Sequence, residues 1–282
     1  MTRIHWLASY PKSGNTWVRI LLANYLENGD RPVDINTLDK ASIVSARELN
    51  DMALGVDTAD LTHEESASLR AAAVRAHARR HSGMLYLKIH DAYTVCENGE
   101  PLIPADVSAG VVYIARNPLD VAPSAARHWS ISLDKALEWL ESSVTLSQGR
   151  RKLDRQLPQR LLTWSGHVES WLDQTAIPVH LVRYEDLHRD PVGEMMAMLR
   201  FWGLPGDEGR AAKAVEFSSF EQLAAQEKKH GFREKPAGTG AFFGQGQAGG
   251  WRGRLTPEQV TKVVETQGRV MRRLGYLDGP EP

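Results

Sequence analysis

The stretch that decides the fold is IHWLASYPKSGNTWVRILLANYLE, residues 4–27. Its first part, Ile4–Tyr10, is an apolar run with the length and composition of a buried strand. Its last part, Thr16–Leu26, has apolar residues at helical spacing, and a tight turn containing Gly14 connects the two. A strand that passes through such a turn into a helix directs backbone N–H groups and the positive end of the helix dipole toward one point. The stretch therefore predicts an anion site at residues 10–17.

Three more apolar runs predict buried strands, each bounded by residues that favour turns. They are Met84–His90, Gly110–Arg116 and Val179–Tyr184. Helical patterns lie between and after them, at 64–80, Leu161–Asp173, Pro191–Trp202 and Pro257–Leu274. Strands that alternate with helices favour an α/β fold with a central parallel sheet flanked by helices.

The length of 282 residues and the absence of repeats or a clear linker predict a single domain, residues 1–282. Residues 28–83 form a long insert after the first helix. Lys228–Arg254 contains eight glycines without periodicity and is expected to be a loop that stays mobile or orders around a ligand, with a plain surface loop as the alternative.

Composition excludes several classes of protein. Lys plus Arg number 34 and Asp plus Glu number 35, so the net charge of −1 argues against a dedicated nucleic-acid binder. The single cysteine, Cys96, excludes an internal disulfide and a multi-cysteine metal site. No apolar run approaches the ~18 residues of a membrane span. These features predict a cytoplasmic protein without a membrane partner.

The turn after the first strand carries donors for a phosphate. Lys12 adds a full positive charge, and Ser13 and Thr16 add hydroxyl groups. In the GxxxxGK[ST] loop of nucleotide triphosphatases the lysine follows the last glycine, whereas Lys12 precedes Gly14. Taken alone, an ordinary turn with a solvated lysine is an equally good interpretation.

The third strand ends at a second group of anion donors. Arg116 lies at its carboxyl end, and Ser124 follows about two helical turns later, so a guanidinium and a hydroxyl could grip one phosphate. An isolated arginine more often pairs with a nearby acid on the surface. Asn117 is suited to cap the following helix, and Pro123 is expected to kink or interrupt it.

The second strand supplies a candidate base. Lys88 and His90 lie on one face of the strand, and His90 ends it, where open α/β sheets place their chemistry. An imidazole is suited to act as a general base at neutral pH. The fourth strand ends at Tyr184, whose ring could stack on a base or pack in the sheet.

Six motifs in order resemble those of the cytosolic-type sulfotransferases, which use 3′-phosphoadenosine 5′-phosphosulfate (PAPS) as donor. YPKSGNTW at 10–17 resembles the 5′-phosphosulfate loop, and ARNPLDVAPS at 115–124 resembles the 3′-phosphate motif. The four short motifs are LKIH at 87–90, RYEDL at 183–187, FSSF at 217–220 and GGWR at 249–252. The resemblance implies donor-binding roles for Lys12, Ser13, Gly14, Asn15, Thr16, Trp17, Arg116, Ser124, Tyr184, Ser218, Phe220, Gly249, Gly250, Trp251 and Arg252.

The resemblance also implies a P-loop-like nucleotide-binding fold and a mechanism. His90 would take a proton from the hydroxyl of a small-molecule or natural-product acceptor, which then attacks sulfur. Lys12, helped by Lys88, would stabilise charge on the departing 3′-phosphoadenosine 5′-phosphate (PAP). No metal is required.

The sequence departs from the family at one place. The family's Arg-Lys-Gly grip on the 3′-phosphate corresponds to Gly244, Gln245 and Gly246 here. Recognition of that phosphate would then rest on Arg116 and Ser124, or on a substitute cation. The basic residues of the loop that could substitute are Arg233, Lys235, Arg252 and Arg254.

Two other functions stay open at this point. A P-loop kinase for a small metabolite would need a lysine after the loop glycines and a Walker-type acid. A nucleotide-binding protein without catalysis is disfavoured by the presence of both Lys12 and His90. The sequence does not identify the acceptor or the oligomeric state, although Phe242 and Phe243 are candidates for an acceptor lid.

Overall fold

The computed structural model of the chain describes residues 3–38, 41–146, 155–236, 238–244 and 246–278. The chain divides into two compact units. The first comprises Met1–Tyr10, Lys40–Tyr113 and Ser143–Leu181, and the second comprises Pro11–Asp39, Ile114–Ser142 and Val182–Pro282. The predicted insert is shared between them, and a single domain over 1–282 stays a prediction.

A four-stranded sheet has the order β2-β1-β3-β6. Its strands are β1 (Ile4–Ser9), β2 (Leu85–Ile89), β3 (Ser108–Ala115) and β6 (Val179–Arg183), and the last residues of β3 and β6 belong to the second unit. The pairing of β1 with β2 is parallel, with Ile4 opposite Leu85. Each of the four strands was predicted and ends one residue before its predicted end. His90, Arg116 and Tyr184 are therefore the first residues after their strands.

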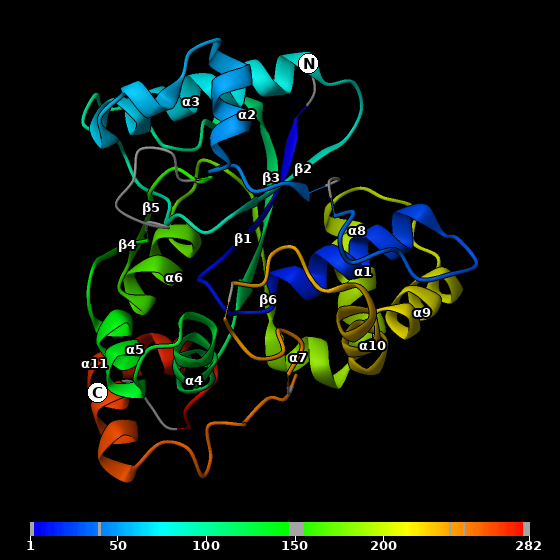
Figure 1. Cartoon of the computed structure of the whole chain (residues 1–282), viewed down its shortest axis with the longest axis vertical. Coiled ribbons are helices and arrows are strands. Elements are labelled where there is room, and N and C mark those ends of the chain that lie inside the picture. Colours follow the sequence, from blue (N-terminus) through cyan, green and yellow to red (C-terminus); the bar gives the residue numbers. More distant parts are fainter. Residues whose placement is uncertain (1–2, 39–40, 147–154, 237, 245, 279–282) are drawn as a thin grey trace. The chain divides into compact units, whose positions relative to one another are not determined.

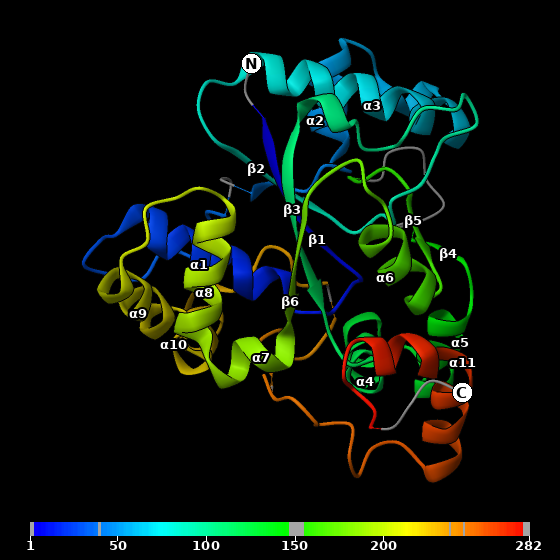
Figure 2. The same ribbon diagram turned by 180° about the vertical axis from the view of Figure 1, so that it is seen from behind.

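The first unit packs helices and a short second sheet around this core (Figures 1 and 2). Trp6, Trp164 and Trp171 are completely buried, and the Trp6 indole donates to Ser108 Oγ at 2.8 Å. The helices are α2 (Arg47–Leu54), α3 (His63–Arg80) and α6 (Trp164–Leu172), with 3₁₀ turns at Thr58–Asp60 and Ala105–Val107, and the second sheet pairs β4 (Val144–Leu146) with β5 (Gln159–Leu162). Helices α2 and α3 lie side by side.

The predicted helix at Leu161–Asp173 begins too early. Gln159–Leu162 is strand β5, which pairs antiparallel with β4, and Thr163 caps the helix that follows. The Thr163 hydroxyl accepts from the Gly166 amide at 2.9 Å. The apolar residues of β5 fit the helical period by chance, and the threonine is the signal that marks the true start.

The second unit is helical. Its elements are α1 (Asn15–Glu27), α4 (Pro118–Trp129), α5 (Leu133–Glu141), α7 (Tyr184–Arg189), α8 (Pro191–Phe201), α9 (Glu208–Phe217), α10 (Phe220–His230) and α11 (Pro257–Arg273). Helix α1 packs on α9, and α11 packs on α4 and α5 (Figures 1 and 2). An apolar cluster built from Ile20, Leu223, Phe232 and Phe243 joins α1, α10 and the segment after α10.

Two expectations for this unit are wrong. Helix α4 continues through Pro123, because the proline removes only the bond to the carbonyl one turn earlier and its fixed φ suits a helix. The glycine-rich loop begins later than Lys228, because α10 extends to His230. The expected cap is confirmed: the Asn117 side chain accepts from the Leu119 amide at 3.0 Å.

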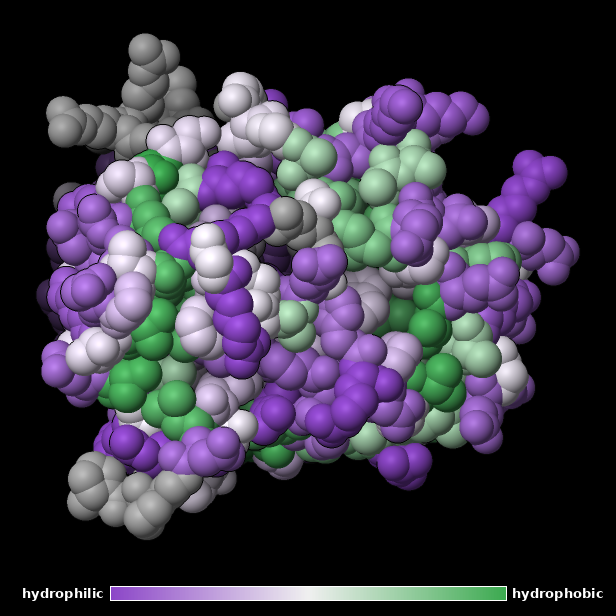
Figure 3. Space-filling view, turned by 90° about the horizontal axis from the view of Figure 1, so that it is seen from below, coloured by the Kyte–Doolittle hydropathy of each residue, from purple (hydrophilic) through white to green (hydrophobic). Residues whose placement is uncertain are grey.

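Among the residues that the structure describes, no helix combines the length and apolar character needed to cross a bilayer. On the face drawn in Figure 3, hydrophobic residues lie in separate groups divided by hydrophilic ones.

Candidate active site

The first loop of the second unit places Lys12 and Ser13 immediately before α1. Lys12 and Gly14 both have positive φ, of 69° and 102°. A Cβ at Gly14 would lie 2.5 Å from Cδ2 of Tyr184, so only glycine fits this turn. Gly14 starts α1 without a side-chain cap, and the buried Ser13 Oγ has no hydrogen-bond partner among the described residues. A buried hydroxyl that lacks a hydrogen-bond partner among the described residues, beside a helix N-terminus, suits the binding of an anionic ligand.

The other residues of this motif form the first turn of α1. Asn15 is buried and begins the helix, and Thr16 is half-buried. The Trp17 indole donates to the carbonyl oxygen of Ser218 at 3.0 Å. The motif is thereby tied to the FSSF segment of the sequence, which was predicted to contact the same ligand.

Arg116 connects three parts of the second unit. Its guanidinium donates to the carbonyl oxygens of Lys12 at 3.1 Å and Gln247 at 3.0 Å. The same group lies 4.2 Å from the centre of the Tyr184 ring, a cation–π contact. Two predicted donor contacts, Arg116 and Tyr184, are therefore in direct contact with each other.

Tyr184 is buried and its ring is surrounded by the first loop. The Trp17 ring lies 5.9 Å away edge-on, and His188 lies 4.6 Å away. Burial raises the pKa of Tyr184, and the nearby Arg116 partly offsets this. The tyrosine is thus a neutral aromatic wall of the loop, and its contact with adenine stays a prediction.

Ser218 and Phe220 occupy different surroundings. Ser218 is fully buried, and its hydroxyl donates to Ala214 O at 2.7 Å and accepts from Asn24 Nδ2 at 3.0 Å. Phe220 lies against the loop, where a Cβ at Gly246 would collide with its ring. Of this predicted pair, only Phe220 approaches the glycine-rich loop with its side chain.

Asp120 holds the GGWR segment and was missed as a site residue. Its carboxylate accepts from the amides of Gly249 at 2.7 Å and Trp251 at 2.9 Å. Arg252 lies over the Trp251 ring, 4.7 Å from its centre. Gly250 lies between these contacts, so the predicted segment is fixed to α4. The only sequence signal is an acid in the first turn of α4, which is equally typical of a favourable helix charge.

Glu227 fixes the other end of the loop. Its buried carboxylate accepts from the amides of Phe242 at 2.8 Å and Phe243 at 2.9 Å, and pairs with Lys235 at 3.1 Å. Burial alone would raise the pKa of Glu227, but these hydrogen bonds and the lysine lower it below its usual value. Phe243 is buried in the apolar cluster, whereas Phe242 lies over Lys12, with Nζ 4.5 Å from the ring centre.

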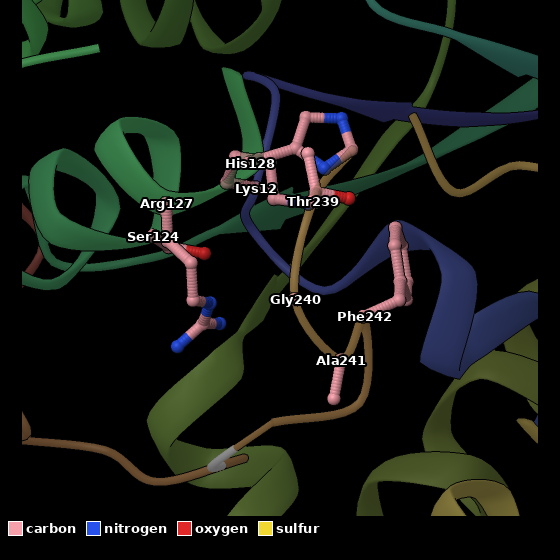
Figure 4. A pocket seen from close by; sticks show the side chains of 8 residues that line it. All are labelled: Lys12, Ser124, Arg127, His128, Thr239, Gly240, Ala241 and Phe242. Atoms are coloured by element: carbon pink, nitrogen blue, oxygen red, sulfur yellow. The ribbon is translucent and has the colours of Figure 1, made fainter. Parts of the chain in front are cut away.

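A small pocket in the second unit brings the loop and α4 together (Figure 4). Ser124 and Arg127 reach it from α4, and Phe242 stands on the opposite side. The complete lining is Lys12, Ser124, Arg127, His128, Thr239, Gly240, Ala241 and Phe242. Two cations and a hydroxyl in one pocket suit a phosphate or sulfate group. Of the lining residues, Lys12 and Ser124 were predicted and Arg127 was not. Gln245, named in the sequence prediction, lies outside the described residues.

The first unit holds His90 by a defined hydrogen bond. His90 Nδ1 lies 2.9 Å from the carbonyl oxygen of Ser9 and 3.2 Å from Ser9 Oγ. A carbonyl only accepts, so Nδ1 carries the proton and Nε2 has the basic lone pair. This tautomer is the one required for a general base that acts through Nε2.

A buried network supports the backbone of His90. His167 Nε2 donates to the His90 carbonyl at 3.0 Å, and His167 Nδ1 accepts from the Tyr113 hydroxyl at 2.8 Å. Complete burial lowers the pKa of His167 to about 4 and raises that of Tyr113 well above its ordinary value, so both are neutral. The next residue, Asp91, forms a two-pronged buried ion pair with Arg70 at 2.8 and 2.7 Å.

Lys88 is positioned by hydrogen bonds of its backbone. Its backbone pairs with the chain at 42–44, where its amide donates to Ser42 O and its carbonyl accepts from the Val44 amide, both at 2.9 Å. The side chain is half-buried. The predicted assistance from Lys88 stays a prediction.

The second unit thus combines an uncapped helix start with a cationic pocket, which suits an α/β protein that binds a phosphate or sulfate group, and the first unit holds an oriented histidine. The chain belongs to the sulfotransferase domain family, whose model matches residues 3–275. This confirms the predicted enzyme class, a PAPS-dependent sulfotransferase.

Individual relatives are distant and cover most of the chain. Cytosolic sulfotransferase 1 of Arabidopsis thaliana is 27% identical over 91% of this chain and 75% of its own length. Sulfotransferase 1A1 of Canis lupus familiaris is 23% identical over 95% of this chain and 83% of its own.

Solved structures confirm the fold. Retinol dehydratase in complex with androsterone and inactive cofactor PAP matches with a TM-score of 0.63 at 19% identity, covering 100% of this chain and 84% of its own. Mouse sulfotransferase SULT7A1 complexed with PAP matches with a TM-score of 0.61 at 20% identity, covering 96% of this chain and 85% of its own.

Proposed function

We propose that this sulfotransferase transfers the sulfuryl group of PAPS to the hydroxyl of a small-molecule acceptor, with His90 as general base and Lys12 at the leaving group. The observation that carries the catalytic assignment is the hydrogen bond from His90 Nδ1 to the Ser9 carbonyl. It fixes the proton on Nδ1 before any substrate arrives and leaves the basic lone pair on Nε2.

The proposed step balances as follows. His90 Nε2 takes the proton of the acceptor hydroxyl, whose oxygen forms the new bond to sulfur. The bond from sulfur to the bridging phosphate oxygen breaks, and its electron pair leaves on PAP. The Lys12 ammonium and the amides at the start of α1 stabilise that charge. Positioning and charge stabilisation dominate such transfers, as they do in phosphoryl transfer.

Binding of the donor is proposed to rest on the second unit. Ser13 Oγ, a buried donor without a partner among the described residues, fits the 5′-phosphosulfate. Arg116 and Ser124 would hold the 3′-phosphate, with Tyr184 and Phe220 beside the adenine. The structures of relatives solved with PAP support this ligand class.

The acceptor class is proposed from two observations. Retinol dehydratase has been crystallised with androsterone and with retinol, both small alcohols. In this chain the side of the pocket opposite α4 carries the aromatic ring of Phe242, a surface suited to an apolar acceptor. We also propose a cytoplasmic location, as for the cytosolic relatives, and a single functional domain over residues 1–282.

Calorimetric titration with PAP, and with ATP–magnesium in parallel, tests the donor. We expect micromolar binding of PAP and no saturable binding of ATP–magnesium. Incubation with PAPS and a panel of phenolic and aliphatic alcohols then tests transfer, detected as the sulfate ester by mass spectrometry. Binding of ATP alone would favour a kinase. Binding of PAP without transfer to any alcohol in the panel would count against the proposed acceptor class.

A further inference from the structure

Arg127 is a cation of the pocket that no sequence motif indicated. It follows Ser124 by one helical turn on α4, and both side chains line the pocket with Lys12 (Figure 4). Gly244 lies next to it: a Cβ built there would be 3.5 Å from both Cζ and Nη1 of Arg127. The Arg127 guanidinium of α4 therefore lies beside Gly244, a loop residue that has no side chain.

The charges around Arg127 are of the same sign. Partial burial lowers its pKa, and the nearby Arg254 and Arg116 lower it further. Among the described residues no acid pairs with Arg127, and its guanidinium makes no hydrogen bond. The like charges of Arg254 and Arg116 repel that of Arg127, although exposure of Arg127 weakens the effect through solvent screening.

Arg116 provides a contrast within the same cluster. Its guanidinium donates to two backbone carbonyls and lies against the Tyr184 ring, so the protein itself satisfies much of its bonding capacity. Arg127 keeps its planar fork of N–H donors available to solvent. A bound anion with several oxygens would satisfy that fork and remove the repulsion.

We propose that Arg127 binds the 3′-phosphate of the donor together with Ser124, supplying from α4 the cation that the loop lacks at Gly244. The inference rests on the proposed function and adds a specific residue to it. Ser124 and Arg127 lie at i and i+3 on one face of α4, so a hydroxyl and a guanidinium can reach the same phosphate. Lys12 remains the cation of the 5′ side, since it belongs to the loop before α1.

A pair of nucleotides tests this assignment. PAP carries the 3′-phosphate, and adenosine 5′-monophosphate lacks it but keeps the base and the 5′-phosphate. In Arg127→Ala we expect calorimetry to show PAP binding weakened roughly 10- to 100-fold, as for loss of a charged hydrogen bond, and adenosine 5′-monophosphate binding changed less than about twofold. Arg127→Lys keeps the charge without the fork and should fall between the two proteins.

Arg200→Ala is the matched control, because Arg200 is an exposed helical arginine of the same unit, on α8. It should bind both nucleotides like the wild type. Equal PAP affinity in Arg127→Ala and wild type would overturn the inference and leave the proposed function intact. An equal loss for both nucleotides would also overturn it, because Arg127 would then act on the shared part of the ligand. Failure of the wild type to bind PAP would instead refute the proposed donor, and the inference with it.

Discussion

His90 in the first unit and Arg127 in the second are two polar residues with proposed roles, and their surroundings are opposite. The His90 ring is oriented by its hydrogen bond to the Ser9 carbonyl. The backbone carbonyl of His90 accepts a hydrogen bond from His167, and the other ring nitrogen of His167 accepts one from the Tyr113 hydroxyl. Arg127 is exposed and has two other guanidinium groups as electrostatic neighbours. The proposed base therefore has a defined tautomer in the protein alone, whereas the proposed anion contact keeps its N–H donors available for a ligand. General bases require one defined tautomer, while repelling cations gain most from a ligand of opposite charge.

Removal of the base should give the largest effect and tests whether the oriented histidine is catalytic. His90→Asn keeps an amide donor for the Ser9 carbonyl but has no basic nitrogen. We expect kcat to fall roughly 10²- to 10⁴-fold, the range for loss of a general base, with PAP affinity unchanged. Steady-state rates with PAPS and calorimetry with PAP measure the two quantities.

His63→Ala removes an exposed imidazole from α3 of the same unit and should leave both quantities unchanged. If His90→Asn turned over at the wild-type rate, His90 would have only a structural role, and the contrast between the two units would lose its mechanistic meaning.

The His90 side of this contrast could be predicted from local sequence, but Arg127 and the groups that orient the site residues could not. Strand periodicity and the motifs located His90, Arg116 and Tyr184 one residue after the ends of their strands, and Lys12 three residues after the end of β1. The groups that orient them come from far along the chain. His167 lies 77 residues after His90, and this pairing exists only because the fold brings α6 to the end of β2.

The glycine-rich loop shows the same limit. Its sequence has no periodicity, so it was expected to stay mobile or to order around a ligand. Two carboxylates fix it instead: Glu227 holds the Phe242 and Phe243 amides, and Asp120 holds those of Gly249 and Trp251. A lone acid in a helix carries no signal of which amides it will accept from, because the match depends on three-dimensional placement.

The internal support of His90 predicts an acid-sensitive first unit. The pKa of His167 is about 4 in the folded protein, against an ordinary value of 6.5. The unfolded chain therefore binds a proton first as the pH falls, and the folded state loses stability between about pH 6.5 and pH 4. The difference corresponds to about 3 kcal/mol of unfolding free energy, present in full above about pH 6.5.

His167→Gln isolates this contribution, because its amide can still donate to the His90 carbonyl and accept from Tyr113 but does not titrate. We expect the free energy of unfolding, measured by urea titration from pH 7.5 to pH 4.5, to fall less steeply in the variant than in the wild type. The other histidines contribute equally to both proteins. Parallel curves would mean that His167 is not buried as a neutral ring, and the base would then lack its prepared support.

The smallest effect is expected where the protein, and not the ligand, orders part of the anion site. Asp120→Asn leaves one side-chain oxygen where two now accept from the Gly249 and Trp251 amides. One charged hydrogen bond is lost, so the loop should hold the donor less firmly, and we expect PAP affinity to fall roughly tenfold. At saturating PAPS, kcat should change little, since the first unit is untouched.

Asp207→Asn is the control, because asparagine caps a helix as well as aspartate does and Asp207 caps α9, remote in sequence from the loop. If PAP bound to Asp120→Asn as tightly as to the wild type, the GGWR segment would, like Arg127, be ordered by the anion itself. Only the residues of the first unit would then be positioned by the protein alone. The phosphate-binding residues of the second unit would all depend on the ligand for their order.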